Sequence, residues 1–271
     1  MITFPKSKIN LGLRITGKRS DGYHDIETVF YPVSLSDAME FVESNGLSED
    51  ELVVTGKRIN SSPGHNLIIK ALHKIREKHI LPFFRIHLHK AIPSGAGLGG
   101  GSSDAAMILK AVNKCYGLGL NNETMKEYAL EIGSDCPFFL NPVPSLASGR
   151  GEILKPVIPF LAGYFIVIVN PGISISTGEA YTNCFPSNTV NSLETIFSRD
   201  PSEWRKLVIN DFEDYVFGIH PGIGKIKDLL YETGAILSLM SGSGSTVYGI
   251  FKEKPGLPQQ LEKLLLFEGR L

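Results

Sequence analysis

The feature that most constrains the fold of this chain is a glycine-rich stretch between a predicted strand and a predicted helix. Residues 93–106 read PSGAGLGGGSSDAA, so that five of fourteen positions are glycine. Polar and apolar side chains alternate over residues 83–91, which is typical of a strand. The apolar, alanine-containing segment 105–115 ends before Gly117, which is typical of a helix with a glycine stop signal.

The succession of strand, glycine loop and helix predicts a site for an anion. Ser102, Ser103 and Asp104 stand where they can cap the N-terminus of the helix. Glycine lets a ligand approach the backbone closely, and free N–H groups at a helix N-terminus, aided by the helix dipole, attract negative charge. We therefore expect the loop to bind phosphate. The candidate cofactor-binding residues are Pro93, Ser94, Gly95, Ala96, Gly97, Leu98, Gly99, Gly100, Gly101, Ser102 and Ser103.

Three other interpretations of the loop fit the sequence less well. The loop lacks the Gly-Lys-Ser/Thr ending of a Walker A motif. Gly95, Gly97 and Gly100 match the dinucleotide pattern G-x-G-x-x-G, but residues 118–122 contain no acid to bind a ribose about 20 residues downstream. A flexible linker is disfavoured because linkers rarely stand between a clear strand and a well-capped helix.

Composition excludes several classes of protein. A chain of 271 residues can form one large domain or two smaller ones. The formal net charge of −1 lacks the basic excess of a general nucleic-acid-binding protein, so that no such partner is expected. Three widely spaced cysteines without a C-x-x-C pair indicate a reducing compartment. Apolar runs are too short to span a membrane and the first residues show no signal-peptide pattern, so we expect a cytoplasmic protein.

Polar residues also stand on predicted strands near the N-terminus. Residues 8–14 alternate, which puts Lys8 and Asn10 on one face of a strand. Taken alone, both side chains fit a solvated face of a half-exposed strand. A turn-rich loop over residues 17–22 leads into a second strand over residues 23–30, so a hairpin is predicted.

Asp135 stands at the start of a short predicted helix. Residues 122–132 are typical of a helix that Gly133 ends, and Pro137 fits the first turn of the next helix. Asp135 then lies at the N-terminus of that helix, where a capping role alone would explain it. Cys136 beside it is interpreted as a buried thiol rather than a nucleophile.

The rest of the chain adds strands, turns and a closing helix. Residues 145–157 and 236–251 each predict strand, turn and strand, and residues 165–170 predict an apolar strand. Residues 255–269 predict a helix that closes the chain. His87 and His89 lie on one face of a strand, and are interpreted as exposed residues rather than metal ligands because no third ligand is suggested nearby.

Four of these segments together resemble one family. They are the glycine loop, the N-terminal K-x-N-L-x-L series with its D-G-Y-H element, the G-x-D-x-P-F-F segment around Asp135, and the Ser-Gly-Ser-Gly-Ser turn. The pattern is similar to that of the GHMP kinases. The resemblance implies a two-domain α/β (α+β) fold with mixed sheets packed against helices and an active site in the cleft between the domains. It implies an N-terminal ATP-binding domain over residues 1–157 and a C-terminal domain over residues 158–271.

The resemblance also implies roles for individual residues. Asp135 is the expected general base, and Lys8 is the neighbouring cation that stabilises charge in the transition state. The expected cofactors are ATP and Mg²⁺, with the Mg²⁺ ligands left open among Ser102, Ser103 and Asp104. The residues expected to bind the acceptor are Asn10, Tyr23, His24, Phe30, Thr177 and Tyr181.

The D-G-Y-H element at residues 21–24 resembles members of the family whose acceptor is a cytidine diphosphate-linked polyol. The expected activity is therefore ATP-dependent phosphorylation of a hydroxyl of such a polyol, in the non-mevalonate route to isoprenoid precursors. Two alternatives remain: a kinase of the same family for another small alcohol, and a non-catalytic nucleotide-binding protein. A dinucleotide-dependent oxidoreductase ranks last.

Overall fold

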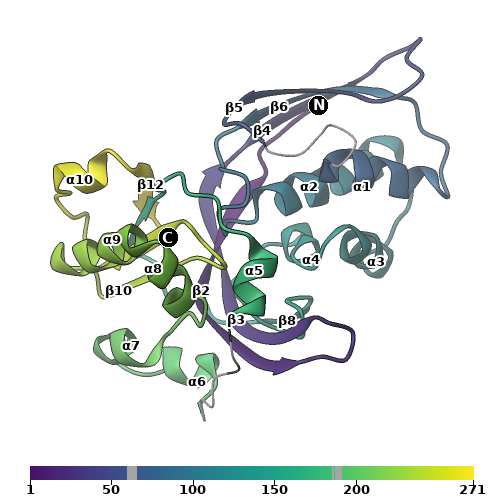
Figure 1. Ribbon diagram of the computed structural model, residues 1–271. Coiled ribbons are helices and arrows are strands. Elements are labelled where there is room, and N and C mark those ends of the chain that lie inside the picture. Colours follow the sequence, from purple (N-terminus) through teal and green to yellow (C-terminus); the bar gives the residue numbers. More distant parts are fainter. Residues whose placement is uncertain (60–65, 185, 187–190) are drawn as a thin grey trace. The chain divides into compact units, whose positions relative to one another are not determined.

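The computed structural model describes residues 1–59, 66–184, 186 and 191–271, and the chain forms two compact units (Figure 1). The first unit contains Met1–Lys8, Leu35–Ser94 and Gly99–Pro142. The second contains Ile9–Ser34, Gly95–Leu98 and Val143–Leu271. The domain boundary after residue 157 stays a prediction, since each unit is assembled from segments that are not contiguous in the sequence.

The first unit is built on a four-stranded mixed sheet with the order β1-β4-β6-β5. Its strands are β1 (Ile2–Thr3), β4 (Ala38–Glu43), β6 (Phe84–Lys90) and β5 (Glu51–Gly56). β6 pairs antiparallel with β4 and parallel with β5. Along β6 the side chains of Phe84, Ile86 and Leu88 are buried while those between them are exposed, so one face of this strand packs inward.

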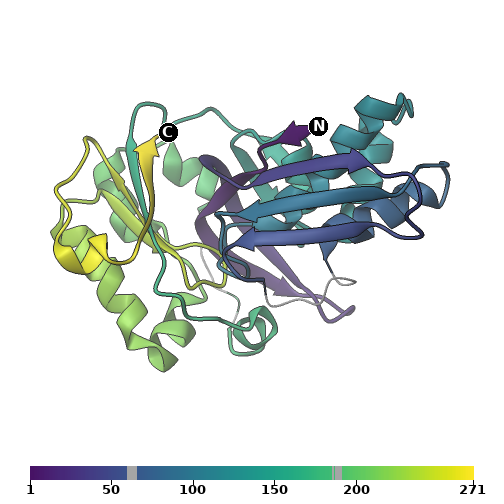
Figure 2. The same ribbon diagram turned by 90° about the horizontal axis from the view of Figure 1, so that it is seen from above.

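Helices cover that inner face of the sheet in the first unit (Figures 1 and 2). α1 (Leu67–Arg76) and α2 (Gly100–Tyr116) lie next to the sheet, and α3 (Asn122–Ile132) and α4 (Cys136–Leu140) pack against these two helices (Figure 1). In α1, Ile68, Leu72 and Ile75 recur at helical spacing and are fully buried, which makes the helix amphipathic. α3 has the bounds that the sequence predicts, and its N-cap Asn121 accepts a bond from Thr124.

The second unit contains two antiparallel sheets. One has the order β2-β3-β7-β8 and is built around the predicted N-terminal hairpin. Its strands are β2 (Lys6–Lys18), β3 (His24–Ser36), β7 (Ser145–Ser148) and β8 (Ile153–Pro156). β2 belongs to the second unit from Ile9 onwards. The other sheet has the order β10-β11-β9-β12, with β10 (Leu237–Met240), β11 (Val247–Phe251), β9 (Phe165–Val169) and β12 (Leu265–Arg270). All five residues of β9 are buried, so this strand lies in the core.

Short helices complete the second unit. They are α5 (Thr177–Thr182), α6 (Leu193–Phe197), α7 (Pro201–Leu207), α8 (Glu213–Ile219), α9 (Pro221–Glu232) and α10 (Gln259–Glu262). Phe212, Val216 and Leu230 join Val167 and Val247 in one apolar core. Burial of such side chains is the main force that holds helices against a sheet.

The closing helix predicted over residues 255–269 is wrong. Only the four residues of α10 are helical, and the chain then continues as β12, which pairs antiparallel with β9. This pairing completes the backbone hydrogen bonds of an otherwise open edge of the buried strand β9. Long-range pairing therefore overrides the apolar run that indicated a helix.

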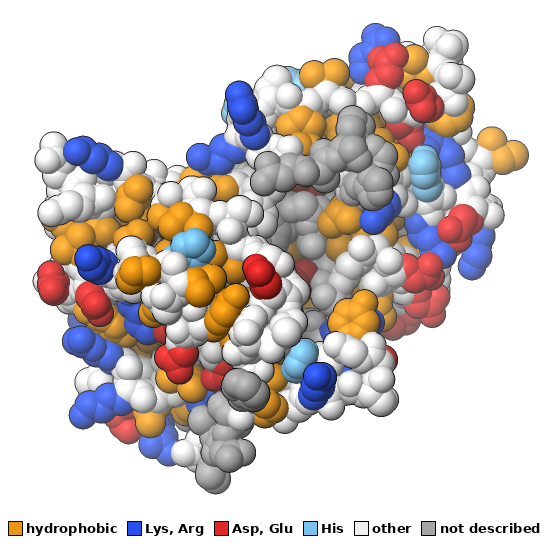
Figure 3. Space-filling model, viewed as in Figure 1, with side chains coloured by type: hydrophobic (Ala, Val, Ile, Leu, Met, Phe, Trp, Pro, Cys, Tyr) orange, Lys and Arg blue, Asp and Glu red, His pale blue; other side chains and the backbone are white. Residues whose placement is uncertain are grey.

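Acidic and basic side chains are interspersed on the face of the molecule that Figure 3 shows, in keeping with the formal net charge of −1. Among the described residues, the helices are too short or too polar to cross a membrane.

Candidate active site

Helix α2 begins directly at the glycine loop, earlier than the sequence predicts. It starts at Gly100, and Gly99 is the N-cap residue with a φ of 70° and no side-chain capping bond. The expected cap by Ser102, Ser103 or Asp104 is therefore wrong. The glycines enter the helix themselves, and the backbone N–H groups of its first turn have no partner within the helix. Free N–H groups at a helix N-terminus are suited to bind an anion.

The glycines of the loop fall into two kinds. Gly97 has a φ of 76°, and a Cβ built on it would lie 1.8 Å from the carbonyl oxygen of Ser241. Gly95 has a φ of 63°, is exposed, and would carry a Cβ with no heavy atom within 4 Å. Gly97 is therefore needed for close backbone packing, whereas Gly95 leaves open space at the backbone. Ser94 and Gly101 are exposed as well, which leaves this side of the loop accessible to a phosphate.

Lys8 and Asp135 lie together in the first unit. The Nζ of Lys8 is 3.4 Å from the Oδ2 of Asp135, with 3% of the Lys8 side chain and 30% of the Asp135 side chain exposed. Asp135 occupies the N-cap position of α4, with a proline in the first turn, but its side chain makes no capping bond. A capping role alone therefore does not explain it. Lys8 is buried rather than solvated, which corrects the half-exposed interpretation of its strand.

Aromatic rings gather near the D-G-Y-H element in the second unit. The His24 and Tyr181 rings stack with centroids 5.1 Å apart and an interplanar angle of 15°. Tyr181 also meets Phe212 edge to face at 4.9 Å, which fixes its orientation. Tyr23 is 57% exposed, and the guanidinium of Arg150 lies 4.8 Å from the centroid of its ring. His24, Tyr23 and Tyr181 thus form a partly open aromatic surface.

The other residues expected to bind the acceptor are more deeply placed. Asn10 is 2% exposed, and its side-chain amide donates to the Thr28 hydroxyl at 3.1 Å. Phe30 is buried in the core at 1% exposure. Thr177 is the first residue of α5, which Ser176 caps through the N–H of Glu179. The hydroxyl of Thr177 lies 3.0 Å from that of Ser243.

A buried ionic cluster, which sequence reasoning missed, lies beneath the start of α2. The ammonium of Lys90 donates to Asp104 at 2.8 Å and also to Asp37. The other oxygen of Asp37 accepts the N–H groups of Ala91 and Ile92, at 2.6 and 2.9 Å. The cluster joins the end of β6 to the first turns of α2, on either side of the loop. A charged residue in an otherwise apolar inward position of a strand is the signal that could have revealed it.

The electrostatics of this cluster follow from its burial. Lys90, Asp37 and Asp104 are each 3% exposed or less. Burial raises the pKa of Asp104, although the attraction of Lys90 opposes this shift. Burial also acts to lower the pKa of Lys90, but the two carboxylates outweigh it and raise that pKa. Lys90 therefore stays charged, and the two carboxylates compete for one cation.

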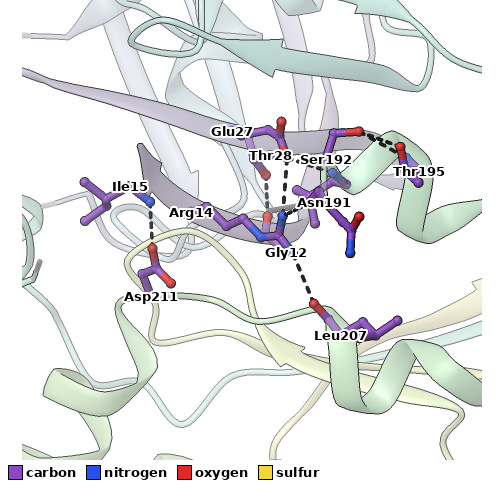
Figure 4. A network of polar contacts seen from close by, with 11 residues as sticks. Gly12, Arg14, Ile15, Glu27, Thr28, Asn191, Ser192, Thr195, Leu207 and Asp211 are labelled. Atoms are coloured by element: carbon purple, nitrogen blue, oxygen red, sulfur yellow. Dashed lines mark hydrogen bonds and ion pairs between the residues drawn. The ribbon is translucent and has the colours of Figure 1, made fainter. Parts of the chain in front are cut away.

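A second polar network supports the hairpin of the second unit (Figure 4). Arg14 on β2 donates hydrogen bonds to the carbonyl oxygens of Asn191 and of Leu207, the latter at 3.2 Å. Its guanidinium nitrogen Nη1 also lies 3.7 Å from the carboxylate oxygen Oε1 of Glu27. Glu27 accepts the N–H of Leu193 at the start of α6. In the same network, Asp211 accepts the N–H of Ile15 at 2.7 Å. These contacts fix β2 and β3, whose turn carries Tyr23, against the helical part of the unit.

The remaining candidates have structural roles. His87 and His89 both contact the Thr55 hydroxyl, at 3.0 and 3.1 Å, and among the described residues no group of three or more potential ligands could hold a metal ion. Cys136 is buried, as the sequence predicts, and burial raises the pKa of its thiol to about 12. The family resemblance also implies that residues 65–68 lie near the nucleotide base, and of these His65 lies outside the described residues.

Comparison with known proteins gives a consistent result. The family model for the GHMP kinases N terminal domain matches residues 66–141, and that for the GHMP kinases C terminal domain matches residues 192–265. A 4-diphosphocytidyl-2-C-methyl-D-erythritol kinase of Bacteroides thetaiotaomicron is 47% identical over 275 residues, covering 100% of both chains. The corresponding kinase of Parabacteroides distasonis is 44% identical, also over 100% of both chains. A crystal structure of 4-(cytidine 5'-diphospho)-2C-methyl-D-erythritol kinase superposes with a TM-score of 0.76 and 31% identity, covering 92% of this chain and 90% of that one.

Proposed function

The chain belongs to the 4-diphosphocytidyl-2-C-methyl-D-erythritol kinases of the GHMP kinase family, and from this we infer its reaction. It transfers the γ-phosphoryl group of ATP to a hydroxyl of 4-diphosphocytidyl-2-C-methyl-D-erythritol, in the non-mevalonate synthesis of isoprenoid precursors. The observation that carries this conclusion is the 47% identity with a kinase of that name over the full length of both chains.

Asp135 and Lys8 are suited to the chemical step. The acceptor hydroxyl gives its proton to the carboxylate of Asp135 as its oxygen forms a bond to the γ-phosphorus. The bond between that phosphorus and the bridging oxygen of the leaving group breaks, and ADP departs. Lys8, 3.4 Å from Asp135, contributes positive charge where negative charge builds up. These two roles rest on the pair of opposite charges and on the partial exposure of the carboxylate.

The glycine loop suits the phosphates of ATP. The open backbone at Gly95 and the first turn of α2 provide N–H donors, which fits the residues from Pro93 to Ser103 as its binding site. Mg²⁺ would neutralise charge on the β- and γ-phosphates and takes most of its ligands from phosphate and water. Asp104 is bonded to Lys90 and Ser103 is buried. Of the three candidates, we therefore assign Ser102 as the residue whose hydroxyl oxygen would bind Mg²⁺.

The aromatic surface of the second unit suits the cytidine part of the acceptor. A pyrimidine ring can stack on Tyr23 or Tyr181, and an imidazole can hydrogen-bond to the edge of the base. We place Tyr23, His24 and Tyr181 in direct contact with the acceptor. Thr177 is the next candidate, while Asn10 and Phe30 are buried and support the strands that carry the others.

The extent of the domains and the compartment are part of the same proposal. Residues 1–157 form the N-terminal ATP-binding domain and residues 158–271 the C-terminal domain, since the two family matches fall on opposite sides of this boundary. The three cysteines are free, which fits a reducing compartment such as the cytoplasm.

A coupled assay of ADP release with MgATP and four acceptors tests the function. The acceptors are 4-diphosphocytidyl-2-C-methyl-D-erythritol, homoserine, galactose and mevalonate. Turnover with the cytidyl compound alone is expected. Turnover with one of the other three acceptors would overturn the substrate assignment and keep the phosphoryl transfer. Binding of ATP without turnover on any acceptor would favour a nucleotide-binding protein that is not a catalyst.

A further inference from the structure

The side chain of Arg150 lies over the ring of Tyr23, and no step of the proposed reaction uses it. Its guanidinium carbon is 4.8 Å from the centroid of that ring. Arg150 stands in the turn between β7 and β8, and both residues belong to the second unit. A guanidinium over an aromatic face is a favourable contact, because electrostatic attraction to the ring adds to the stacking of two flat groups.

The turn that carries Arg150 is attached to strand β3. The carbonyl oxygen of Gly149 accepts the N–H of Ile26 at 2.7 Å, close to the start of that strand. The N–H of Gly151 donates to the carbonyl oxygen of Ser148 at 3.1 Å, which closes the turn. Gly149 has a φ of 67°, a conformation that glycine adopts without strain. Backbone bonds therefore fix Arg150 beside the D-G-Y-H element.

Glu152 orients the guanidinium of Arg150. Its Oε2 accepts the backbone N–H of Arg150 at 2.6 Å, and its Oε1 lies 3.8 Å from the Nε of the same residue. The side chains of Arg150 and Glu152 are 30% and 20% exposed, so both are partly enclosed by protein. A Cβ built on Gly149 would lie 3.0 Å from the Oε2 of Glu152, so this carboxylate packs directly against the turn. One carboxylate thus holds both the backbone and the head group of Arg150.

The backbone of Tyr23 is fixed by its own turn. Its N–H donates to the Oδ1 of Asp21 at 3.1 Å, and its carbonyl oxygen accepts the N–H of Arg19 at 2.9 Å. Arg19 also forms an ion pair with Asp21 at 3.0 Å. Tyr23 is nevertheless 57% exposed. An exposed ring on a fixed backbone can occupy several rotamers, and a contact to the ring itself is what restricts it.

We propose that Arg150 is a positioning residue for Tyr23, an inference that rests on the acceptor assignment made above. Arg150 covers one face of the ring, holds Tyr23 in one orientation and leaves the opposite face for the pyrimidine of the acceptor. A ring that is already ordered loses little conformational freedom when the base stacks on it, and this raises affinity. Arg150 therefore strengthens acceptor binding through Tyr23, and the phosphates of the acceptor are not its target.

Binding of cytidine, CMP and CDP to variants of the full chain, measured by calorimetry, tests this role. R150Q is expected to weaken all three by a similar factor of about fivefold, and R150K, which keeps a cation near the ring, is expected to weaken them less. K155Q is the control and should leave all three affinities unchanged, because Lys155 is an exposed cation on β8 that pairs with Glu194. Weaker binding of CDP with unchanged binding of cytidine would show that Arg150 binds phosphate, and would overturn the proposal.

The variant Y23A shows whether Arg150 acts through the ring. R150Q should cause no further loss of CDP affinity in the Y23A background, because the group that Arg150 positions is already gone. In steady-state kinetics, R150Q alone should raise KM for the acceptor about fivefold and change KM for ATP by less than about twofold. Equal losses of CDP affinity from R150Q with and without Tyr23 would overturn the proposal.

A measurement without any ligand separates this proposal from the substrate assignment. The ring of Tyr23, labelled with ¹³C and identified by the signal that Y23F removes, should be more mobile on the picosecond to nanosecond timescale in R150Q than in the wild type. K155Q should leave its mobility unchanged. An unchanged ring in R150Q would overturn the proposal whichever alcohol the enzyme phosphorylates. If the wild type binds none of the three cytidine ligands, the acceptor assignment fails, and ring mobility still decides whether Arg150 orients Tyr23.

Discussion

The ammonium nitrogen of Lys8 lies 3.4 Å from the Oδ2 of Asp135, and the two side chains differ in exposure, at 3% and 30%. The cation is thus enclosed by protein while the carboxylate is open enough to reach a ligand. Asp135 leads a five-residue helix, α4, whose residues are all buried, so its backbone is held firmly. This difference in exposure fits Asp135 as a base that receives a proton from a bound hydroxyl, and Lys8 as a cation held in a fixed position.

Replacement of either member of this pair should abolish turnover and preserve ATP binding. D135N removes the base and K8A removes the cation, and each is expected to lower kcat by about two orders of magnitude or more. Affinity for a non-hydrolysable ATP analogue, measured by calorimetry, should stay within about threefold of the wild type. K6A is the control, because Lys6 is an exposed lysine on the same strand. Near-normal turnover in D135N and K8A would refute these roles.

The aromatic surface predicts a selective effect on the acceptor. H24A and Y181A each break the 5.1 Å stack between the two rings. H24A also removes a hydrogen bond to the edge of the base, and Y181A removes a ring that stacks on it, so each should raise KM for the acceptor about tenfold. KM for ATP should change less than about twofold in both variants. H73A is the control, because His73 is exposed on α1 in the other unit. Equal increases in both KM values would argue against the placement of the acceptor.

Local patterns in the sequence located most of the elements of this site. Alternation identified β6, and the glycine run with Gly117 identified the loop and helix α2. The proline at the start of α4 placed Asp135 at its N-terminus. Each of these signals comes from neighbouring residues, whose backbone preferences act over a few positions. The predicted start of α2 lies too late in the chain because polar residues were taken as its N-cap, whereas the N-cap residue is Gly99.

Contacts between distant segments could not be predicted in the same way. Lys90 stands out as a charged residue at an inward position of β6, but nothing in the local pattern identifies Asp37 and Asp104 as its partners, and only the fold brings the three charges together. The bond from Ser241 to Gly97 and the pairing of β12 with β9 also join segments far apart in the chain. Such contacts depend on which surfaces meet, and a single sequence contains no periodic signal for that.

The two loop glycines should differ sharply in their tolerance of alanine. In G97A, the new Cβ would lie 1.8 Å from the carbonyl oxygen of Ser241, which forces the backbone apart. G95A introduces only the strain of a positive φ, of order 1 kcal/mol, because no atom lies within 4 Å. We expect G97A to lose most of its turnover and several degrees of melting temperature, and G95A to lose little stability. Equal stability losses in thermal unfolding would contradict this packing.

The buried carboxyl of Asp104 should make the free energy of unfolding depend on pH, and D104N should remove this contribution. Burial raises the pKa of its carboxyl, so the folded chain holds this proton up to a higher pH than the unfolded chain, whose pKa is near 4. Between these two pKa values the folded state binds more protons, and the free energy of unfolding therefore falls as pH rises, by up to about 1.4 kcal/mol per pH unit from this group. The difference in free energy of unfolding between wild type and D104N, from urea titrations between about pH 4 and pH 8, should decrease with pH. A constant difference would contradict the inferred shift.

The three cysteines should differ in reactivity in the folded chain. Burial raises the pKa of the Cys136 thiol to about 12 and that of the Cys184 thiol to about 11, so few thiolates form there at pH 8. Cys115 is exposed near the C-terminal end of α2, at the opposite end of this helix from the loop. A disulfide reagent at pH 8 should therefore label one thiol per native chain, none in C115S, and all three after unfolding. Turnover should survive the labelling, because the modified thiol is separated from Asp135 and the glycine loop by the length of α2. Rapid labelling of Cys136 with loss of activity would instead show that the segment around Asp135 opens in the native enzyme.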